Sequence, residues 1–128
     1  MQYVVQGLVG LIVLLFLFMG LNFMVNPVAA GGGIGLEALD INGMSSLRGD
    51  MGGLFLGTAA LLIYGLVRRN EGAFLAAAVY MGAIALCRIL GFAQEGMGES
   101  ALTAFAVEIV IVLLLVYAWA RLPKLRQP

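Results

Sequence analysis

The stretch that decides the fold is residues 4–25, VVQGLVGLIVLLFLFMGLNFMV, which contains no charged residue. An α-helix of about 20 residues crosses the roughly 30 Å hydrocarbon core of a bilayer, and this stretch is long enough to do so. It closes at Asn26-Pro27, a pair that directs the chain out of the helical conformation. We therefore expect a membrane-spanning helix here.

Three further apolar segments follow, at residues 51–67, 73–92 and 101–120. The whole chain is 62% hydrophobic and 11% charged, whereas soluble domains average about 25% charged residues. Its 128 residues leave room for one compact unit, and in lipid each helix satisfies its own backbone hydrogen bonds. The sequence predicts a single all-α domain over residues 1–128, an integral membrane four-helix bundle.

The first segment also resembles a signal peptide, because Val28-Ala29-Ala30 has the small residues of a cleavage site. It lacks a basic region before the apolar run, and that run exceeds the 7 to 15 residues or so of a signal peptide. We expect it to be retained as a span. Residues 26–49 form the one long connection, which is glycine-rich and is expected to be a flexible loop with residues 36–44 near the membrane interface.

The charges are sorted between the two sides of these spans. Most basic residues outside the spans gather in the second loop and the C-terminal tail, and most acidic residues in the first and third loops. Because positive residues mark the cytoplasmic side, this pattern predicts that both termini lie inside and the acidic loops outside. The basic group is Arg68, Arg69, Arg121, Lys124 and Arg126, and the acidic group is Glu37, Asp40, Glu95 and Glu99.

Composition also bears on cofactors and partners. The chain has no histidine and one cysteine, Cys87, so it lacks His ligands for zinc or haem and cannot form an internal disulfide. We expect no metal and no cofactor. The formal net charge is zero, so no global basic field attracts nucleic acid, and the expected partners are membrane lipid, a second copy of the chain or another membrane protein.

Arg88 and Glu108 lie inside the third and fourth apolar segments. A charge within a span costs about 2.5 kcal/mol or more unless it is paired or reaches water, so such residues usually face a bundle interior. Neighbouring antiparallel helices would bring the two side chains into the same half of the bundle, although Arg88 could also reach outward to Glu95. A pair is expected, with Glu108 slightly favoured, either as a lock between helices or as a functional site.

The residues Arg48, Asp50, Arg88, Glu95 and Glu108 together form a candidate ligand-binding or polar cluster toward the outer side. Arg48 and Asp50 flank Gly49 at the mouth of the second span, where they belong either to this cluster or simply to the membrane interface. Gly49, Gly53 and Gly57 repeat every four residues, which puts them on one face of that helix and predicts close packing against another helix.

Several of these positions also carry a family resemblance. The segments Leu47-Arg48-Gly49-Asp50-Met51-Gly52-Gly53 and Cys87-Arg88-Ile89-Leu90-Gly91, then Glu95-Gly96 and Glu108, resemble the bacterial membrane proteins of the domain-of-unknown-function 4345 family. Cys87 stands where a glycine or another small residue is common. The resemblance spans nearly the whole chain and implies a four-helix inner-membrane protein, but it brings no activity.

Four functions fit this pattern. The first is a lipid-binding or apolar-ligand-binding accessory module whose polar cluster meets a head group. The others are a small proton-coupled transporter that uses Glu108, a structural subunit of a membrane complex, and a membrane-embedded acid/base enzyme. Without histidine, the enzyme would depend on carboxylates or Tyr80, so whether the chain is an enzyme stays open at this point.

Overall fold

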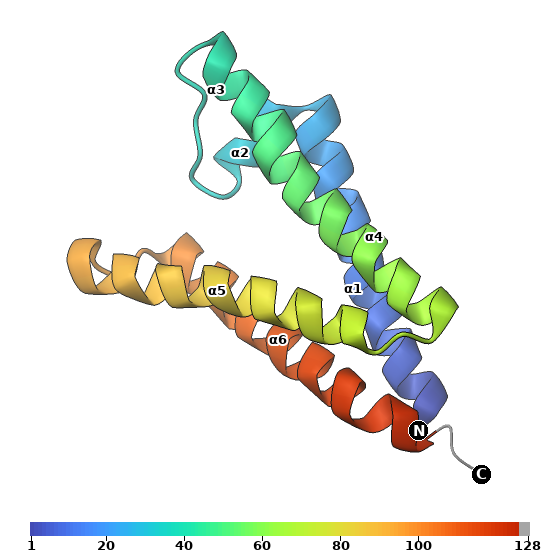
Figure 1. Cartoon of the computed structure of the whole chain (residues 1–128). Helices are drawn as coiled ribbons and strands as arrows, with labels where there is room; N and C mark the ends of the chain where they lie inside the picture. The colour runs from blue at the N-terminus through green and yellow to red at the C-terminus, as the bar shows by residue number, and fades with distance from the viewer. Residues whose placement is uncertain (126–128) are drawn as a thin grey trace. The chain divides into compact units, whose positions relative to one another are not determined.

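The computed structural model describes residues 1–125, and Arg126, a member of the basic tail, lies outside them. Within that part of the chain every regular element is a helix, and four helices are long and apolar enough to cross a membrane. The all-helical, four-span prediction is confirmed at this level. The elements are α1 (Gln2–Val25), α2 (Pro27–Gly32), α3 (Ile41–Ser46), η1 (Leu47–Met51), α4 (Gly52–Arg68), α5 (Gly72–Glu95) and α6 (Glu99–Leu125). Figure 1 labels the six α-helices.

The chain forms two compact units, each described by itself. The first, called here the N-terminal unit, is Leu11–Ala60 and holds most of α1, the short helices and the first half of α4. The second, the C-terminal unit, combines Met1–Gly10 with the chain from Leu61 onward, and contains α5 and α6.

Aromatic stacking and a glycine join α1 to α4 in the N-terminal unit. The Phe55 ring lies between Phe16 and Phe23, with ring centroids 5.5 Å and 5.8 Å away. Gly20 is buried against Leu56, and a Cβ atom at Gly20 would lie 2.6 Å from the Leu56 Cγ and 3.1 Å from its backbone nitrogen. Only a residue without a side chain lets the two helices approach this closely.

The second span begins earlier than the sequence predicts. Helical residues continue without a break from Ile41 to Arg68, so the part of the expected loop after Asp40 belongs to the span. The start of α3 is set by Asp40, whose carboxylate accepts hydrogen bonds from the backbone nitrogens of Asn42 and Gly43, both at 2.9 Å. The bond from the Gly43 amide is the main cause that holds the pKa of Asp40 below its ordinary value, and the Asn42 side chain contributes next.

The glycine face predicted for close packing is not what holds α1 to α4. Gly49, Gly53 and Gly57 are all exposed, and a Cβ atom at any of them would meet no atom within 4 Å. The close approach instead uses Gly20 on α1 and Gly52 on α4, which is buried beside Phe23 and Met24. Spacing of four residues identifies a shared helix face, but it does not say which side of the helix meets a neighbour.

In the C-terminal unit, α4 turns sharply into α5. Arg69 adopts the left-handed conformation with φ of 52°, and the Asn70 amide returns to the Gly65 carbonyl at 3.0 Å, which closes the end of α4. Gly65 is buried, and a Cβ atom there would lie 2.7 Å from the Phe74 ring. The missing side chain therefore lets the first turn of α5 fold back onto the end of α4.

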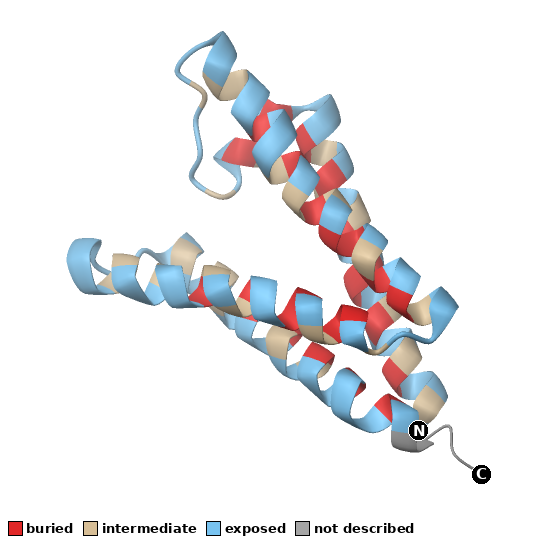
Figure 2. Ribbon diagram, in the orientation of Figure 1, coloured by how far each residue is buried: buried red, intermediate tan, exposed pale blue. Residues whose placement is uncertain are grey.

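Helices α5 and α6 lie side by side over most of their length (Figure 1). In Figure 2 the buried residues follow one side of α5, and the end of that helix near Glu95 is exposed. The buried residues of α5 are mostly alanine, and those of α6 are mostly larger aliphatic side chains. The buried residues are Ala73, Phe74, Ala77, Ala78, Met81 and Ala85 on α5, and Glu108, Ile111, Leu115, Ala118 and Leu122 on α6.

Candidate functional site

Arg88 and Glu108 occupy positions in the packed seam between α5 and α6. On α6 the buried residues from Glu108 to Leu122 recur at alternating steps of three and four, which keeps them on one face of a helix. On α5 the same alternation leads from Ala78 to Arg88, so Arg88 continues the apolar stripe. The two charges therefore face each other because the packing pattern of both helices places them there.

The pair has the geometry of a two-pronged ion pair. The Nε of Arg88 donates to Oε2 of Glu108 at 3.0 Å, and Nη2 donates to Oε1 at 2.7 Å. The Glu108 side chain is 12% exposed and that of Arg88 is 30% exposed. Parallel N–H···O bonds of this kind are among the strongest that side chains make, and they orient both partners. The structure thus selects Glu108, the partner that the sequence slightly favoured over Glu95.

Glu108 uses both of its oxygens on Arg88, but Arg88 does not use all of its donors on Glu108. A guanidinium carries five N–H groups, and the two bonds to Glu108 leave about three of them. Among the described residues no other hydrogen bond of the Arg88 side chain is found. Arg88 is therefore both a lock between the helices and a source of N–H donors on its more exposed edge.

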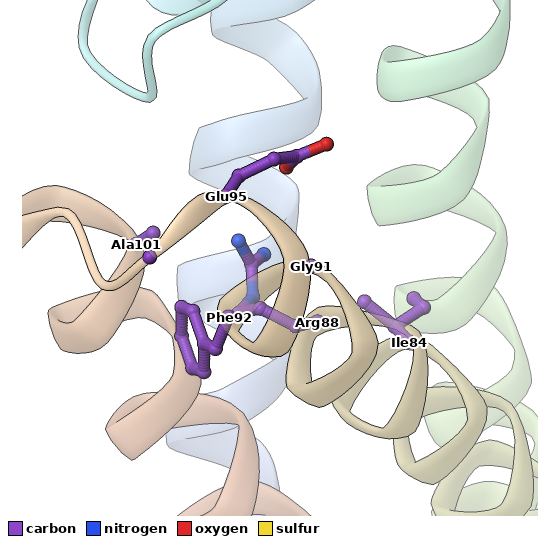
Figure 3. Close-up of a pocket in the computed structure, with 7 residues that line it drawn as sticks. Ile84, Arg88, Gly91, Phe92, Glu95 and Ala101 are labelled. Carbon is purple, nitrogen blue, oxygen red and sulfur yellow. The ribbon is translucent and has the colours of Figure 1, made fainter.

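That edge borders an open cavity of about 330 Å³ at the end of the seam. The cavity lies between the last turns of α5 and the first turn of α6, and Figure 3 shows Arg88, Phe92 and Glu95 projecting from successive turns of α5. The ring of Phe92 packs edge-on against Phe105 of α6, with centroids 5.6 Å apart. The lining residues are Ile84, Arg88, Gly91, Phe92, Glu95, Gly96 and Ala101.

Gly91 keeps the floor of this cavity open. It lies three residues after Arg88 and four before Glu95, so the three residues share one face of α5. A Cβ atom at Gly91 would have the Glu95 Oε2, 3.7 Å away, as its only neighbour within 4 Å. A larger side chain at this position would extend into the space between the guanidinium and the carboxylate.

Glu95 is the second charged group of the cavity wall. Its side chain is exposed, and within residues 1–125 it forms no ion pair. With Arg88 and Glu108 neutralising each other, an ionised Glu95 leaves the cavity with a net negative charge.

Arg48 and Asp50, the other two members of the predicted cluster, belong to the N-terminal unit. There the Nε of Arg48 donates to the backbone oxygen of Met24 at 3.1 Å, which satisfies a carbonyl at the end of α1. Asp50 is exposed in η1. The cavity itself is lined only by residues from Ile84 to Ala101, so the structure gives Arg48 a capping role in its own unit.

No group of three or more His, Cys, Asp or Glu side chains that could hold a metal ion is found in the described part of the chain. Cys87 is exposed, and its thiol makes no disulfide.

The sequence identified the charged residues of the site but not the uncharged residues that line the cavity beside them. Ile84, Gly91, Phe92 and Ala101 were not predicted as site residues, although Gly91 was noted in the family pattern. A usable signal was present: the alternation of three and four that runs through Ala78, Met81 and Ala85 continues to Arg88 and Phe92. If the pattern is extended to Glu95, the same face of α5 contains Arg88, Phe92 and Glu95, which all line the cavity.

The comparisons with known proteins identify one family. No curated protein and no solved structure matches the chain. The model of one family, described as a domain of unknown function, DUF4345, matches residues 4–119. That match covers most of each of the four spans and every residue of the cavity, and the chain therefore belongs to the DUF4345 family.

Proposed function

We propose that this protein is a small membrane module that holds the polar end of an amphipathic lipid in the cavity between α5 and α6. The observation that carries the proposal is the free edge of Arg88, whose N–H donors face a cavity with the apolar walls Ile84, Phe92 and Ala101. Small-molecule sites combine apolar walls with a few directed polar groups, and both kinds of lining are present here.

The size of the cavity fits a head group better than a whole lipid. Its 330 Å³ is at the lower end of the range of about 300 to 1,000 Å³ found for small-molecule pockets. The acyl chains would lie outside it, against the membrane-facing surface of α5, where large apolar side chains are exposed on the sides of the helix away from Arg88. These are Leu86, Ile89 and Leu90, and each is more than two-fifths exposed.

The ion pair argues against the transporter in which Glu108 carries protons. Both Glu108 oxygens accept bonds from Arg88, and a proton on either oxygen would break one of them and leave the guanidinium without its counter-charge. Breaking such a pair within a bundle is costly, because it leaves a charge without its partner. The geometry supports a fixed structural charge at Glu108 and a binding role for Arg88.

We further propose that the four spans form a bundle in the bacterial inner membrane, with both termini inside and the cavity toward the outer face. Support comes from the sorting of charge, with Arg68 and Arg69 in one loop and Glu95 and Glu99 in the next. Single cysteines at positions 70 and 97, in a Cys87→Ser background, should react with an impermeant reagent from opposite sides. Reaction of both from one side would refute this topology.

Filling the cavity tests the binding proposal. Gly91→Leu should lower the amount of lipid that co-purifies with the protein, measured by native mass spectrometry, because the new side chain occupies the space beside Arg88. Gly82→Leu is the matched control: it makes the same change on the same helix, and a Cβ atom there meets nothing within 4 Å. Equal lipid content in the two variants, with both folded by circular dichroism, would overturn the proposal.

A further inference from the structure

The charges around the cavity define which head group it accepts. We infer that the site selects a zwitterionic phospholipid with a primary ammonium, such as an ethanolamine head group, in which the phosphate meets Arg88 and the ammonium meets Glu95. This inference rests on the proposed lipid-binding function and specifies its ligand class.

The first step concerns the phosphate. The N–H groups that Arg88 does not use on Glu108 are hydrogen-bond donors at the cavity edge, and a guanidinium recognises phosphate oxygens well. However, the positive charge of Arg88 is already balanced by Glu108, 2.7 Å away. A phosphate would gain directed hydrogen bonds here but little net electrostatic attraction.

The second step concerns the other end of the head group. Glu95 has no ion pair within the described chain, and its carboxylate lies on the same face of α5 as Arg88, across Gly91. A purely anionic lipid would bring a negative charge toward this carboxylate, which is unfavourable. A zwitterion instead brings an ammonium to Glu95, and the sum of the charges in the occupied cavity stays unchanged.

The third step separates a primary ammonium from a quaternary one. An –NH₃⁺ group donates hydrogen bonds to a carboxylate, whereas a trimethylammonium cannot and is bound instead by cages of several aromatic rings. Phe92 is the one aromatic residue in the wall of this cavity. The site therefore has the acceptor for ethanolamine and lacks the cage for choline.

The depth of the two groups is compatible with a lipid in the bilayer. Glu95 ends α5, and Arg88 lies seven residues earlier, about 10 Å deeper at 1.5 Å per residue. The cavity thus reaches from the end of the span into the hydrocarbon region. A head group bound in it would lie one or two helical turns below the end of α5.

The test is a competition in bilayers of known composition. The full-length protein is placed in nanodiscs with equal amounts of phosphatidylethanolamine, phosphatidylglycerol and phosphatidylcholine, and the lipids retained after extraction are quantified by mass spectrometry. The ethanolamine lipid should be enriched over both others. Glu95→Gln should reduce its enrichment over phosphatidylglycerol by about two- to fivefold, the range expected for a partly exposed ion pair.

Glu99→Gln is the matched control, since it removes the same charge four residues later, at the start of α6, from a residue that does not line the cavity. It should leave the enrichment unchanged. Equal effects of the two variants would mean that surface charge alone sorts the lipids, which would overturn the inference. Retention of all three lipids without preference would also overturn it.

The two proposals fail in different ways. If Gly91→Leu releases lipid but no class is preferred, the binding site stands and its assignment to ethanolamine lipids is wrong. If Gly91→Leu releases no lipid, the cavity is not the site, and the proposed function fails first. Glu95 is exposed, so Glu95→Gln is expected to fold and to report on the ligand rather than on stability.

Discussion

The contact between α1 and α4 and the contact between α5 and α6 join similar apolar helices in different ways. The first is made of aromatic rings and a buried glycine, with Phe55 between two rings and Gly20 against Leu56. The second begins as an apolar seam of alanine and leucine and ends in the ion pair of Arg88 and Glu108. The comparison indicates that the first contact depends on the close fit of side chains, whereas the second also depends on the pairing of two charges.

The difference has a physical origin in the membrane. Helices in lipid gain little from burying apolar surface against each other, so association depends on close van der Waals contact and on polar groups between helices. The contact between α1 and α4 uses close contact, since Gly20 lets the backbones approach. The contact between α5 and α6 adds a polar group, and a charged cavity opens beside that seam.

The largest expected effect is on the charged contact. Arg88→Ala should lower the free energy of unfolding by about 3 kcal/mol, because it leaves a buried Glu108 carboxylate without its partner. The value is placed at the lower end of the usual range because the Arg88 side chain is 30% exposed. Equilibrium unfolding in mixed detergent micelles measures it, and Arg48→Ala, which removes one exposed hydrogen bond, should cost less than about 1 kcal/mol.

Adding Glu108→Gln to Arg88→Ala should recover much of the loss, whereas adding Glu95→Gln should recover none. A coupling energy between Arg88 and Glu108 below about 0.5 kcal/mol would show that the pair does not hold α5 to α6. The contrast between the two contacts would then disappear.

A smaller effect is expected from changing shape in the other contact. Gly20→Ala should destabilise the protein by about 1 to 3 kcal/mol, because its Cβ would come within 2.6 Å of Leu56. Gly53→Ala is the matched control on α4. It should be neutral or stabilise by up to about 1 kcal/mol, since alanine is the better helix former and its Cβ meets no atom within 4 Å.

Thermal unfolding of Gly20→Ala and Gly53→Ala shows which of the two glycine positions is closely packed. If Gly53→Ala were as destabilising as Gly20→Ala, the face formed by Gly49, Gly53 and Gly57 would be a packed surface after all, as the sequence predicted. A harmless Gly20→Ala would instead mean that α1 and α4 can separate slightly at no cost.

The smallest effect is expected outside both contacts, at the start of α3. The Gly43 and Asn42 hydrogen bonds lower the pKa of Asp40 from its ordinary value of 3.8, so the folded state binds this proton less tightly than the unfolded state does. The contribution of Asp40 to stability is therefore present above that value and is lost as the pH falls through the lowered pKa. Hydrogen-exchange protection of the Asn42 and Gly43 amides should fall in that window.

Asp40→Asn keeps a hydrogen-bond acceptor at the start of the helix but should remove the pH dependence of this protection. Glu37→Gln, a change of the same kind in the preceding loop, should leave it in place. Persistence of the pH dependence in Asp40→Asn would assign it to another group and would leave both helix contacts unaffected.

Much of the helical framework could be predicted from the sequence. The spans predicted at residues 4–25 and 73–92 agree with α1 and α5 to within a few residues, because an uninterrupted apolar run specifies a helix in lipid. The start of the second span was placed at residue 51, about ten residues too late. Asp40 starts a helix there by bonding to backbone amides, a local signal that hydropathy does not record. Helix α6 continues past Pro123 to Leu125, because a proline removes only a single backbone donor near the helix end.

The candidate site could also be predicted from the sequence only in part. Charges within apolar runs are visible in the sequence, so Arg88 and Glu108 were found, and their cost in lipid predicts that they pair. The choice between Glu108 and Glu95 depends on how far α5 and α6 are shifted along each other, and this register is set by the packing of alanines against larger side chains. Gly49, Gly53 and Gly57 show the opposite case, where a regular pattern indicated a face that makes no close contact in its unit.

By itself the sequence determined an all-helical chain with four membrane-length helices and two charges that needed partners, because hydropathy and the cost of charge in lipid act along each segment separately. Only the tertiary structure decided which carboxylate Arg88 binds, which glycines are packed, and that Gly91 leaves a cavity between Arg88 and Glu95. Those features depend on distances between side chains on different helices or successive turns. Such distances follow from the relative rotation and shift of packed helices, which no single segment specifies.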